Sequence, residues 1–164
     1  MIAVRKFVVF SALLLAGPMA FGQLKVQHIQ RPGAAIATGV WVGDTYYLSG
    51  TMASPVTPAD PAKGTPAVYG NTEAQTMSAL TKIQASLKEQ GLTMGDVVLM
   101  HVYMAGDPAN GGKLDFAGMM KSYKQFFGTP EQPNVPARCA MQVAALAAPW
   151  GLVEIEVTAV RSSK

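Results

Sequence analysis

The chain has 164 residues, of which 49% are hydrophobic and 14% charged, with a formal net charge of +3. This length and composition fit one globular domain. The single cysteine, Cys139, excludes an internal disulfide, so packing must provide the stability of the fold.

Residues 1–22 have the pattern of a secretory signal peptide. A short basic start is followed by an apolar run that a Gly-Pro pair interrupts, and small residues are spaced for cleavage after Gly22. The uninterrupted apolar stretch is shorter than the ~20 residues that a membrane span needs. We therefore expect a periplasmic or secreted domain, residues 23–164, without stable membrane association; a retained anchor or a buried helix are the alternatives.

Cleavage would change the charge of the protein. It removes Arg5 and Lys6 from thirteen basic residues and leaves eleven, against ten acidic ones. A nearly neutral chain has little electrostatic attraction for nucleic acid, so we expect no such partner. No pair of His or Cys residues has metal-ligand spacing, and we expect neither a metal nor a cofactor.

The mature chain begins with a strand-rich segment. Residues 24–30 alternate apolar and polar side chains and predict a first strand. Residues 38–50 contain two β-rich runs around Gly43 and Asp44, a turn-prone pair that predicts a hairpin. Residues 54–70 are rich in Pro and Gly, which predicts a loop.

Residues 71–91 have the pattern of an amphipathic helix. Asn71 or Thr72 can cap its start, acidic residues come early, lysines come late, and Gly91 ends it. Its apolar residues keep to one side and predict a helix lying on a sheet: Ala74, Met77, Leu80, Ile83 and Leu87.

The second half of the chain predicts three more strands and another helix. Residues 95–106 form a near-continuous apolar strand that needs cover on both faces. Asp115 can cap a helix over residues 116–128, and strands follow over 137–146 and 152–161. The order β-β-β-α-β-α-β-β favours an α+β fold, a mixed sheet with both helices on one face.

Alternation along the last two strands suggests where their charges lie, because successive side chains point to opposite faces. The odd positions of both strands suit a core beneath the helices. The even positions would gather polar groups on the other face: Arg138, Gln142, Glu154 and Glu156. Either parity of the strand at 95–106 leaves apolar residues on that face, so we expect further copies of the chain to cover it.

The quoted segments resemble the RidA family, also called YjgF or endoribonuclease L-PSP. The resemblance rests on "PARCAMQVAAL" followed by "EIEVTAV", on "LSGTM" after a hairpin and on "GLTMGDVVLMHVYM" after a helix, and it extends from Ala34 to Arg161. It implies a chorismate-mutase-like fold and a homotrimer with sites at the subunit boundaries. It also implies hydrolysis of 2-imino or 2-enamino acids to 2-keto acids and ammonia.

The same resemblance implies roles for individual residues. Arg138 matches the residue that holds the substrate carboxylate, and a guanidinium suits that task because it can donate two parallel hydrogen bonds. Glu154 matches the glutamate that manages the water and its proton. Ser49 matches a serine near the substrate, Ala140 stands where the family has a cysteine, and Glu156 matches a second acid whose role stays open.

Two departures from the family pattern concern the wall of that site. Ile36 stands at the position of a tyrosine, and Met120 at that of a helix asparagine. These changes keep open a non-catalytic trimer that binds small carboxylates or partner proteins. An interface salt bridge from Arg138 to Glu154 or Glu156 is a second alternative. Cys139 is expected to be a packed thiol on the core face rather than a nucleophile.

Overall fold

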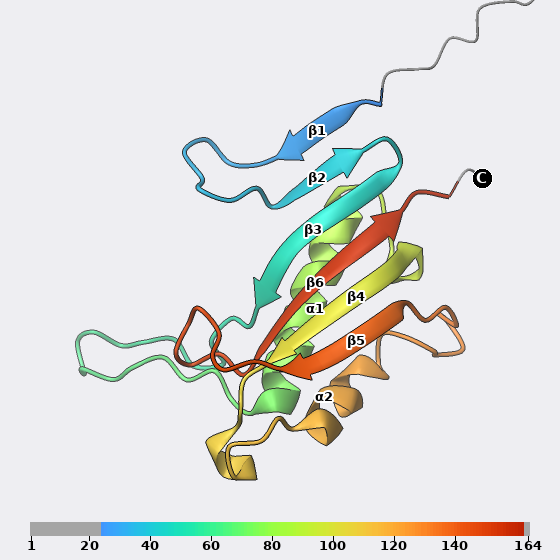
Figure 1. Ribbon diagram of the computed structural model, residues 1–164. Coiled ribbons are helices and arrows are strands. Elements are labelled where there is room, and N and C mark those ends of the chain that lie inside the picture. Colours follow the sequence, from blue (N-terminus) through green and yellow to red (C-terminus); the bar gives the residue numbers. More distant parts are fainter. Residues whose placement is uncertain (1–23, 163–164) are drawn as a thin grey trace, which may run out of the picture.

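A computed structural model describes residues 24–162 and shows one six-stranded sheet with two helices (Figure 1). The spatial order of the strands is β1-β2-β3-β6-β4-β5, and β4 and β5 are parallel while all other neighbours are antiparallel. The strands are β1 (Val26–Ile29), β2 (Gly39–Val42), β3 (Thr45–Met52), β4 (Val97–Met104), β5 (Ala137–Gln142) and β6 (Val153–Val160). The predicted α+β class, the mixed sheet and the element order are confirmed.

The predicted signal peptide lies outside the described residues. Within residues 24–162, no helix has the length and apolar character required to cross a membrane.

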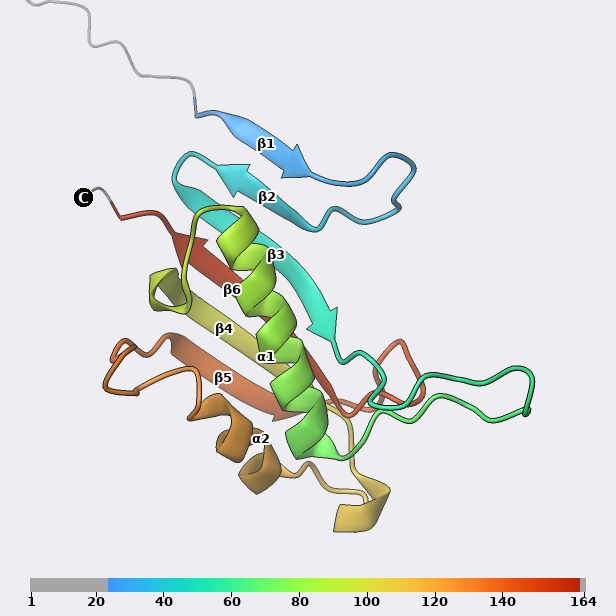
Figure 2. The same cartoon turned by 180° about the vertical axis from the view of Figure 1, so that it is seen from behind.

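Helix α1 (Thr72–Glu89) lies against one face of the sheet (Figure 2). It begins where predicted, because the Asn71 side chain accepts a hydrogen bond of 3.0 Å from the Ala74 amide. Its inner side chains are fully buried against strand residues: Ala79, Leu80, Ile83 and Leu87. The core of the protein therefore sits between this helix and the sheet.

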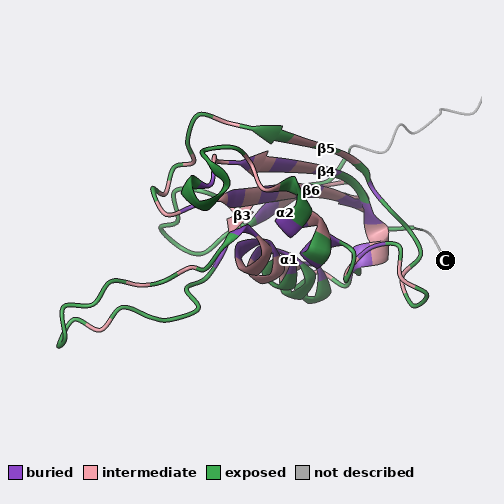
Figure 3. Cartoon of the chain, turned by 90° about the horizontal axis from the view of Figure 1, so that it is seen from below, coloured by how far each residue is buried: buried purple, intermediate pink, exposed green. Residues whose placement is uncertain are grey.

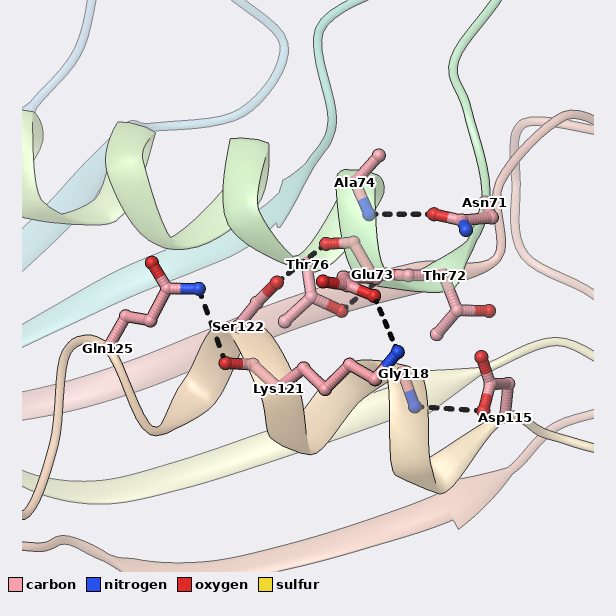
Figure 4. Close-up of polar contacts among 10 residues, drawn as sticks. All are labelled: Asn71, Thr72, Glu73, Ala74, Thr76, Asp115, Gly118, Lys121, Ser122 and Gln125. Carbon is pink, nitrogen blue, oxygen red and sulfur yellow. Dashed lines mark hydrogen bonds and ion pairs between the residues drawn. The ribbon is translucent and has the colours of Figure 1, made fainter.

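Helix α2 (Phe116–Tyr123) lies beside α1 on the same face and covers the end of the sheet at β5 (Figure 2). The Asp115 side chain caps it as predicted, but the helix ends five residues before Gly128. Figure 4 shows how it is fixed to α1: the Ser122 hydroxyl donates to the Glu73 carbonyl at 2.7 Å, and Lys121 pairs with the Glu73 carboxylate at 3.1 Å. Because these contacts tie one side of α2 to α1, the opposite side of α2 faces Arg138 of β5.

The predicted strand 95–106 begins with a short 3-10 turn, Met94–Asp96, before β4. The register against β6 shifts between Val97 and Leu99, so Val98 is exposed. Beyond this bulge Met100, Val102 and Met104 are buried under the helices. Leu99, His101 and Tyr103 alternate with them and point to the other face.

Among residues 24–162, no helix lies over this other face of the sheet, and we call it the open face (Figure 3). On β6 the prediction is confirmed: Val153, Ile155, Val157 and Ala159 are buried, and the glutamates between them are on the open face. Several large apolar or aromatic side chains of the open face are exposed: Tyr47, Leu99 and Met141.

On β5 the predicted parity is wrong. Arg138 pairs with the buried Met100, and the Gln142 side chain bonds Gly112 and Leu114 in the segment before α2, so both lie on the helix side. The predicted strand end at 146 is also wrong, since β5 ends at Gln142. Ten residues, 143–152, join β5 to β6, and β4 lies between the two strands in the sheet. The residues that point to the helices on β6 therefore do not determine which residues do so on β5. Cys139 is accordingly exposed on the open face rather than packed in the core.

The predicted Pro- and Gly-rich loop forms a long arm that extends away from the sheet (Figure 1). Two isolated bridges, Thr57 with Val68 and Asp60 with Thr65, join its two sides. Tyr69 stacks on Trp150 at the base, with ring centroids 3.5 Å apart.

Candidate functional site

The Arg138 guanidinium lies at the edge of the sheet among side chains of α2. Its Nη1 is 3.1 Å from the Met120 sulfur and 3.9 Å from the Met119 sulfur, and its Cζ lies 4.3 Å from the centre of the Tyr123 ring. Thioether sulfur is a weak acceptor, whereas a guanidinium carries five N–H donors. Among residues 24–162 it has no ion pair and no hydrogen bond to oxygen, so most of its donors are available to an anion.

Tyr123 provides a neutral aromatic support for this charge. Burial raises the pKa of the Tyr123 phenol, and the neighbouring Arg138 opposes that rise in part. The ring therefore stays uncharged at neutral pH and stabilises the guanidinium through its π face. Ala140, two residues further along β5, lies on the same side and packs against the core.

Glu154 occupies the open face of β6, between Met52 of β3 and Tyr103 of β4. It is half-buried, and within the described residues it accepts no hydrogen bond and forms no ion pair. Gly50 makes room for it, because a Cβ at that position would collide with the Glu154 carboxylate. The carboxylate is thus free to act on a ligand or a water molecule.

Ser49 lies next to Gly50 and links β3 to the preceding loop. Its hydroxyl donates a 2.7 Å hydrogen bond to the carbonyl of Ala37. Ile36, which precedes Ala37, has 75% of its surface exposed. Ser49 is therefore tied to the loop after Ile36, and its neighbour Gly50 contacts Glu154, whereas Arg138 and Ala140 belong to β5.

The sequence prediction that Arg138 and Glu154 share one face is wrong within a single chain. Arg138 is on the helix side of β5, Glu154 is on the open face of β6, and β4 lies between the two strands. The alternative of a salt bridge from Arg138 to either glutamate is not realised within residues 24–162. Within one chain, the sheet therefore separates the Arg138 guanidinium from the Glu154 carboxylate.

Glu156 is the centre of a hydrogen-bond network that the sequence analysis missed. Its Oε1 accepts from the Tyr103 hydroxyl at 2.9 Å and lies 2.7 Å from Nδ1 of His101. Glu156 and His101 border a hollow of about 280 Å³ on the open face, together with Tyr47 and Leu99. The spacing of His101 and Tyr103, two residues apart on a strand paired with β6, is the signal that points to it.

The part of the chain between residues 24 and 162 contains no cluster of three His, Cys, Asp or Glu residues suited to a metal ion. The polar groups that are available, one guanidinium and one carboxylate, are suited to binding a carboxylate and moving a proton.

Comparison with known proteins identifies the class. The family model described as Endoribonuclease L-PSP matches residues 29–161. The chain is 33% identical to a RutC family protein of Haemophilus influenzae, over 84% of this chain and 97% of the relative. It is also 33% identical to the 2-iminobutanoate/2-iminopropanoate deaminase of Salmonella typhimurium, over 75% of this chain and 84% of that enzyme.

Solved structures agree with this assignment. Escherichia coli TdcF with bound serine matches with a TM-score of 0.60 and 30% identity, over 79% of this chain and 90% of that one. RidA from Psychrobacter sp. PAMC 21119 matches with a TM-score of 0.60 and 28% identity, over 82% and 99%. The chain belongs to the endoribonuclease L-PSP family, which is the YjgF/RidA family.

The hydrogen bond from Tyr103 to Glu156 predicts how the pKa of Tyr103 will respond to a substitution of Glu156. Donation of its hydrogen bond to the Glu156 carboxylate raises the pKa of Tyr103, since a phenolate there would lose the bond and face a like charge. We expect Glu156→Gln to lower the Tyr103 pKa toward the ordinary tyrosine value, measured by NMR of labelled Tyr Cζ. The pKa of Tyr123, which burial raises, should stay unchanged as a control.

The raised pKa of Tyr103 also determines how the stability of the fold depends on pH. A raised pKa means that the folded protein holds the phenolic proton more tightly than the unfolded chain. This contribution to stability is present below the ordinary tyrosine pKa and is lost as the pH rises through the raised value. A Tyr103 pKa that does not move in Glu156→Gln would contradict the assigned hydrogen bond.

Proposed function

We propose that the protein hydrolyses reactive 2-imino acids and their 2-enamino tautomers to 2-keto acids and ammonia. The observation that carries the proposal is Arg138, a half-buried guanidinium whose donors have no oxygen acceptor among the described residues. Such a group is suited to a bidentate contact with the carboxylate of a small acid. Membership of a family that includes a 2-iminobutanoate/2-iminopropanoate deaminase supports the same reaction.

Glu154 supplies the acid-base step of the proposal. Acting on the protonated imine, its carboxylate takes a proton from a water molecule as the water oxygen bonds to the imine carbon and the C=N electron pair moves to nitrogen, which gives a neutral amine. Glu154 then returns this proton to the amine. The C–N bond breaks to release ammonia, and Glu154 takes the hydroxyl proton as the 2-keto group forms and passes it to solvent. Ser49, near Glu154, and the backbone at Ala140, near Arg138, would contact the substrate on either side.

The active assembly in this proposal is a homotrimer with sites at the boundaries between subunits. Two observations support association: the exposed apolar groups of the open face, and the placement of Arg138 and Glu154 on opposite sides of the sheet. Each site would combine Arg138 from one subunit with Glu154 of the partner subunit.

The setting of the reaction is a further part of the proposal. We propose that residues 1–22 direct export, so that the enzyme acts in the periplasm or outside the cell. The nearly neutral mature chain gives no support to a nucleic-acid substrate, although the family model is described as an endoribonuclease.

A non-catalytic role is the second candidate. Met120 contacts Arg138 through a sulfur where a polar side chain would be expected from the family pattern, and Ile36 replaces a tyrosine. Binding of 2-keto acids without turnover of any imine would favour this candidate over the deaminase.

The role of Arg138 predicts a loss of activity on substitution. Imine is generated by an amino-acid oxidase, and its disappearance is followed with and without the protein. Arg138→Ala should lower kcat/KM at least ~100-fold, about 3 kcal/mol, because two charge-assisted hydrogen bonds are lost. Arg138→Lys should recover little, since an ammonium lacks the planar pair of donors.

Lys124→Ala is the matched control, since it removes an exposed cation from the segment just after α2. It should keep the parent rate. An Arg138→Ala protein as fast as the parent would remove Arg138 from the site.

The shared site predicts complementation between two inactive variants. Arg138→Ala and Glu154→Gln should each be inactive alone. When they are co-expressed and purified as mixed assemblies, about a quarter of the boundaries should join an intact Arg138 to an intact Glu154. Activity should return to about that fraction. No recovery, despite mixed assemblies seen by mass spectrometry, would place both residues within one subunit.

A further inference from the structure

We infer that the site prefers substrates with a large apolar side chain, of the kind found in leucine, methionine and phenylalanine. This inference rests on the proposed function, because it assumes that Arg138 holds the carboxylate. It concerns what lies beside the carboxylate anchor, which is a wall of four apolar or aromatic side chains from α2: Phe116, Met119, Met120 and Tyr123.

The wall is produced by the helical repeat. Positions 116, 119, 120 and 123 are spaced by three or four residues, so they share one side of α2. The Arg138 contacts show that this side faces the guanidinium, since both methionine sulfurs and the Tyr123 ring touch it and the Phe116 ring centre is 5.7 Å from Cζ.

Two of the four side chains are accessible to a ligand. Met119 and Tyr123 are buried beneath the guanidinium, whereas Met120 is half-buried and Phe116 has 47% of its surface exposed. A ligand whose carboxylate binds Arg138 therefore has the exposed surfaces of Phe116 and Met120 within reach. Covering these surfaces with hydrocarbon removes apolar area from water, which favours binding.

The wall offers little to a polar substrate side chain. Phe116 has no polar atom, and the Met120 sulfur is a weak acceptor that already lies 3.1 Å from Arg138 Nη1. A hydroxyl placed against it would lose hydrogen bonds to water without replacement. Substrates such as the imine of serine are therefore disfavoured relative to that of leucine.

The wall is also held in place before a ligand arrives. Ser122 and Lys121, on the side of α2 away from the wall, both bind Glu73 of α1 (Figure 4). The position of the side chains at 116 and 120 thus depends on packing between the helices, which favours a fixed specificity.

The test measures the ratio of kcat/KM for the leucine imine to kcat/KM for the alanine imine in the parent protein and in variants. For the parent protein, kcat/KM for the leucine imine should exceed that for the alanine imine by roughly tenfold or more. Phe116→Ala should lower this ratio by about tenfold, and Met120→Asn should shift it toward the serine imine, because the amide supplies polar partners. Lys124→Ala should leave the ratio unchanged.

Binding of the products supplies a readout that does not need turnover. Titration calorimetry of the parent protein with 4-methyl-2-oxopentanoate and with pyruvate should show tighter binding of the former by roughly tenfold, and Phe116→Ala should reduce that difference. Circular dichroism checks that both variants are folded, which the exposure of Phe116 favours.

The outcomes separate the two claims. If no imine is hydrolysed but the larger keto acid binds more tightly, the proposed reaction fails and the apolar specificity stands. If alanine and leucine imines are hydrolysed at equal kcat/KM and neither substitution changes the ratio, the apolar specificity is wrong and the deaminase proposal stands.

Discussion

The arrangement of the site depends on a positive charge that has no negative partner within the described chain. Arg138 is held between two thioether sulfurs and the Tyr123 ring, which support the cation without satisfying its donors. Keeping such a group half-buried costs free energy unless an anion binds it. The docking of α2 on α1 through Glu73 positions the side chains that surround this charge.

The second constraint is that one sheet presents two different faces. Its helix side is covered by α1 and α2, which leave Arg138 half-exposed at the β5 edge, while its open face carries Glu154, the Glu156 network and exposed apolar groups. Because Arg138 and Glu154 belong to opposite sides, neither side of one chain contains the whole chemistry. In the proposed homotrimer, association of copies would both cover apolar surface and complete the site.

Much of the fold could be predicted from the sequence because local signals were strong. Asn71 and Asp115 cap the two helices, Gly43 and Asp44 form the hairpin turn, and the burial of β6 follows its alternation. Alternation singled out Arg138 and Glu154, and the family resemblance assigned their roles and added Ser49 and Ala140, but the position of Arg138 in space did not follow from pattern. Alternation on β5 was ambiguous, because Cys139 and Met141 are apolar yet exposed on an edge strand.

The network at Glu156 escaped prediction for a related reason. The two-residue spacing of His101 and Tyr103 places both on one face of β4, but only the pairing of β4 with β6 brings that face to Glu156. The bulge at Val98 adds a shift that a strict alternation cannot anticipate. The Glu156 network and the bulge at Val98 both depend on pairing between strands that are distant in the sequence, which local pattern does not specify.

The central claim is that Arg138 binds the carboxylate of a small acid at a boundary between subunits. A crystal structure of the mature protein soaked with a 2-oxo acid tests it most directly. We expect both carboxylate oxygens within about 3 Å of Arg138 nitrogens, with Glu154 of the partner subunit beside the 2-oxo carbon. An Arg138 that is paired with a protein carboxylate, or an acid bound elsewhere, would contradict the account.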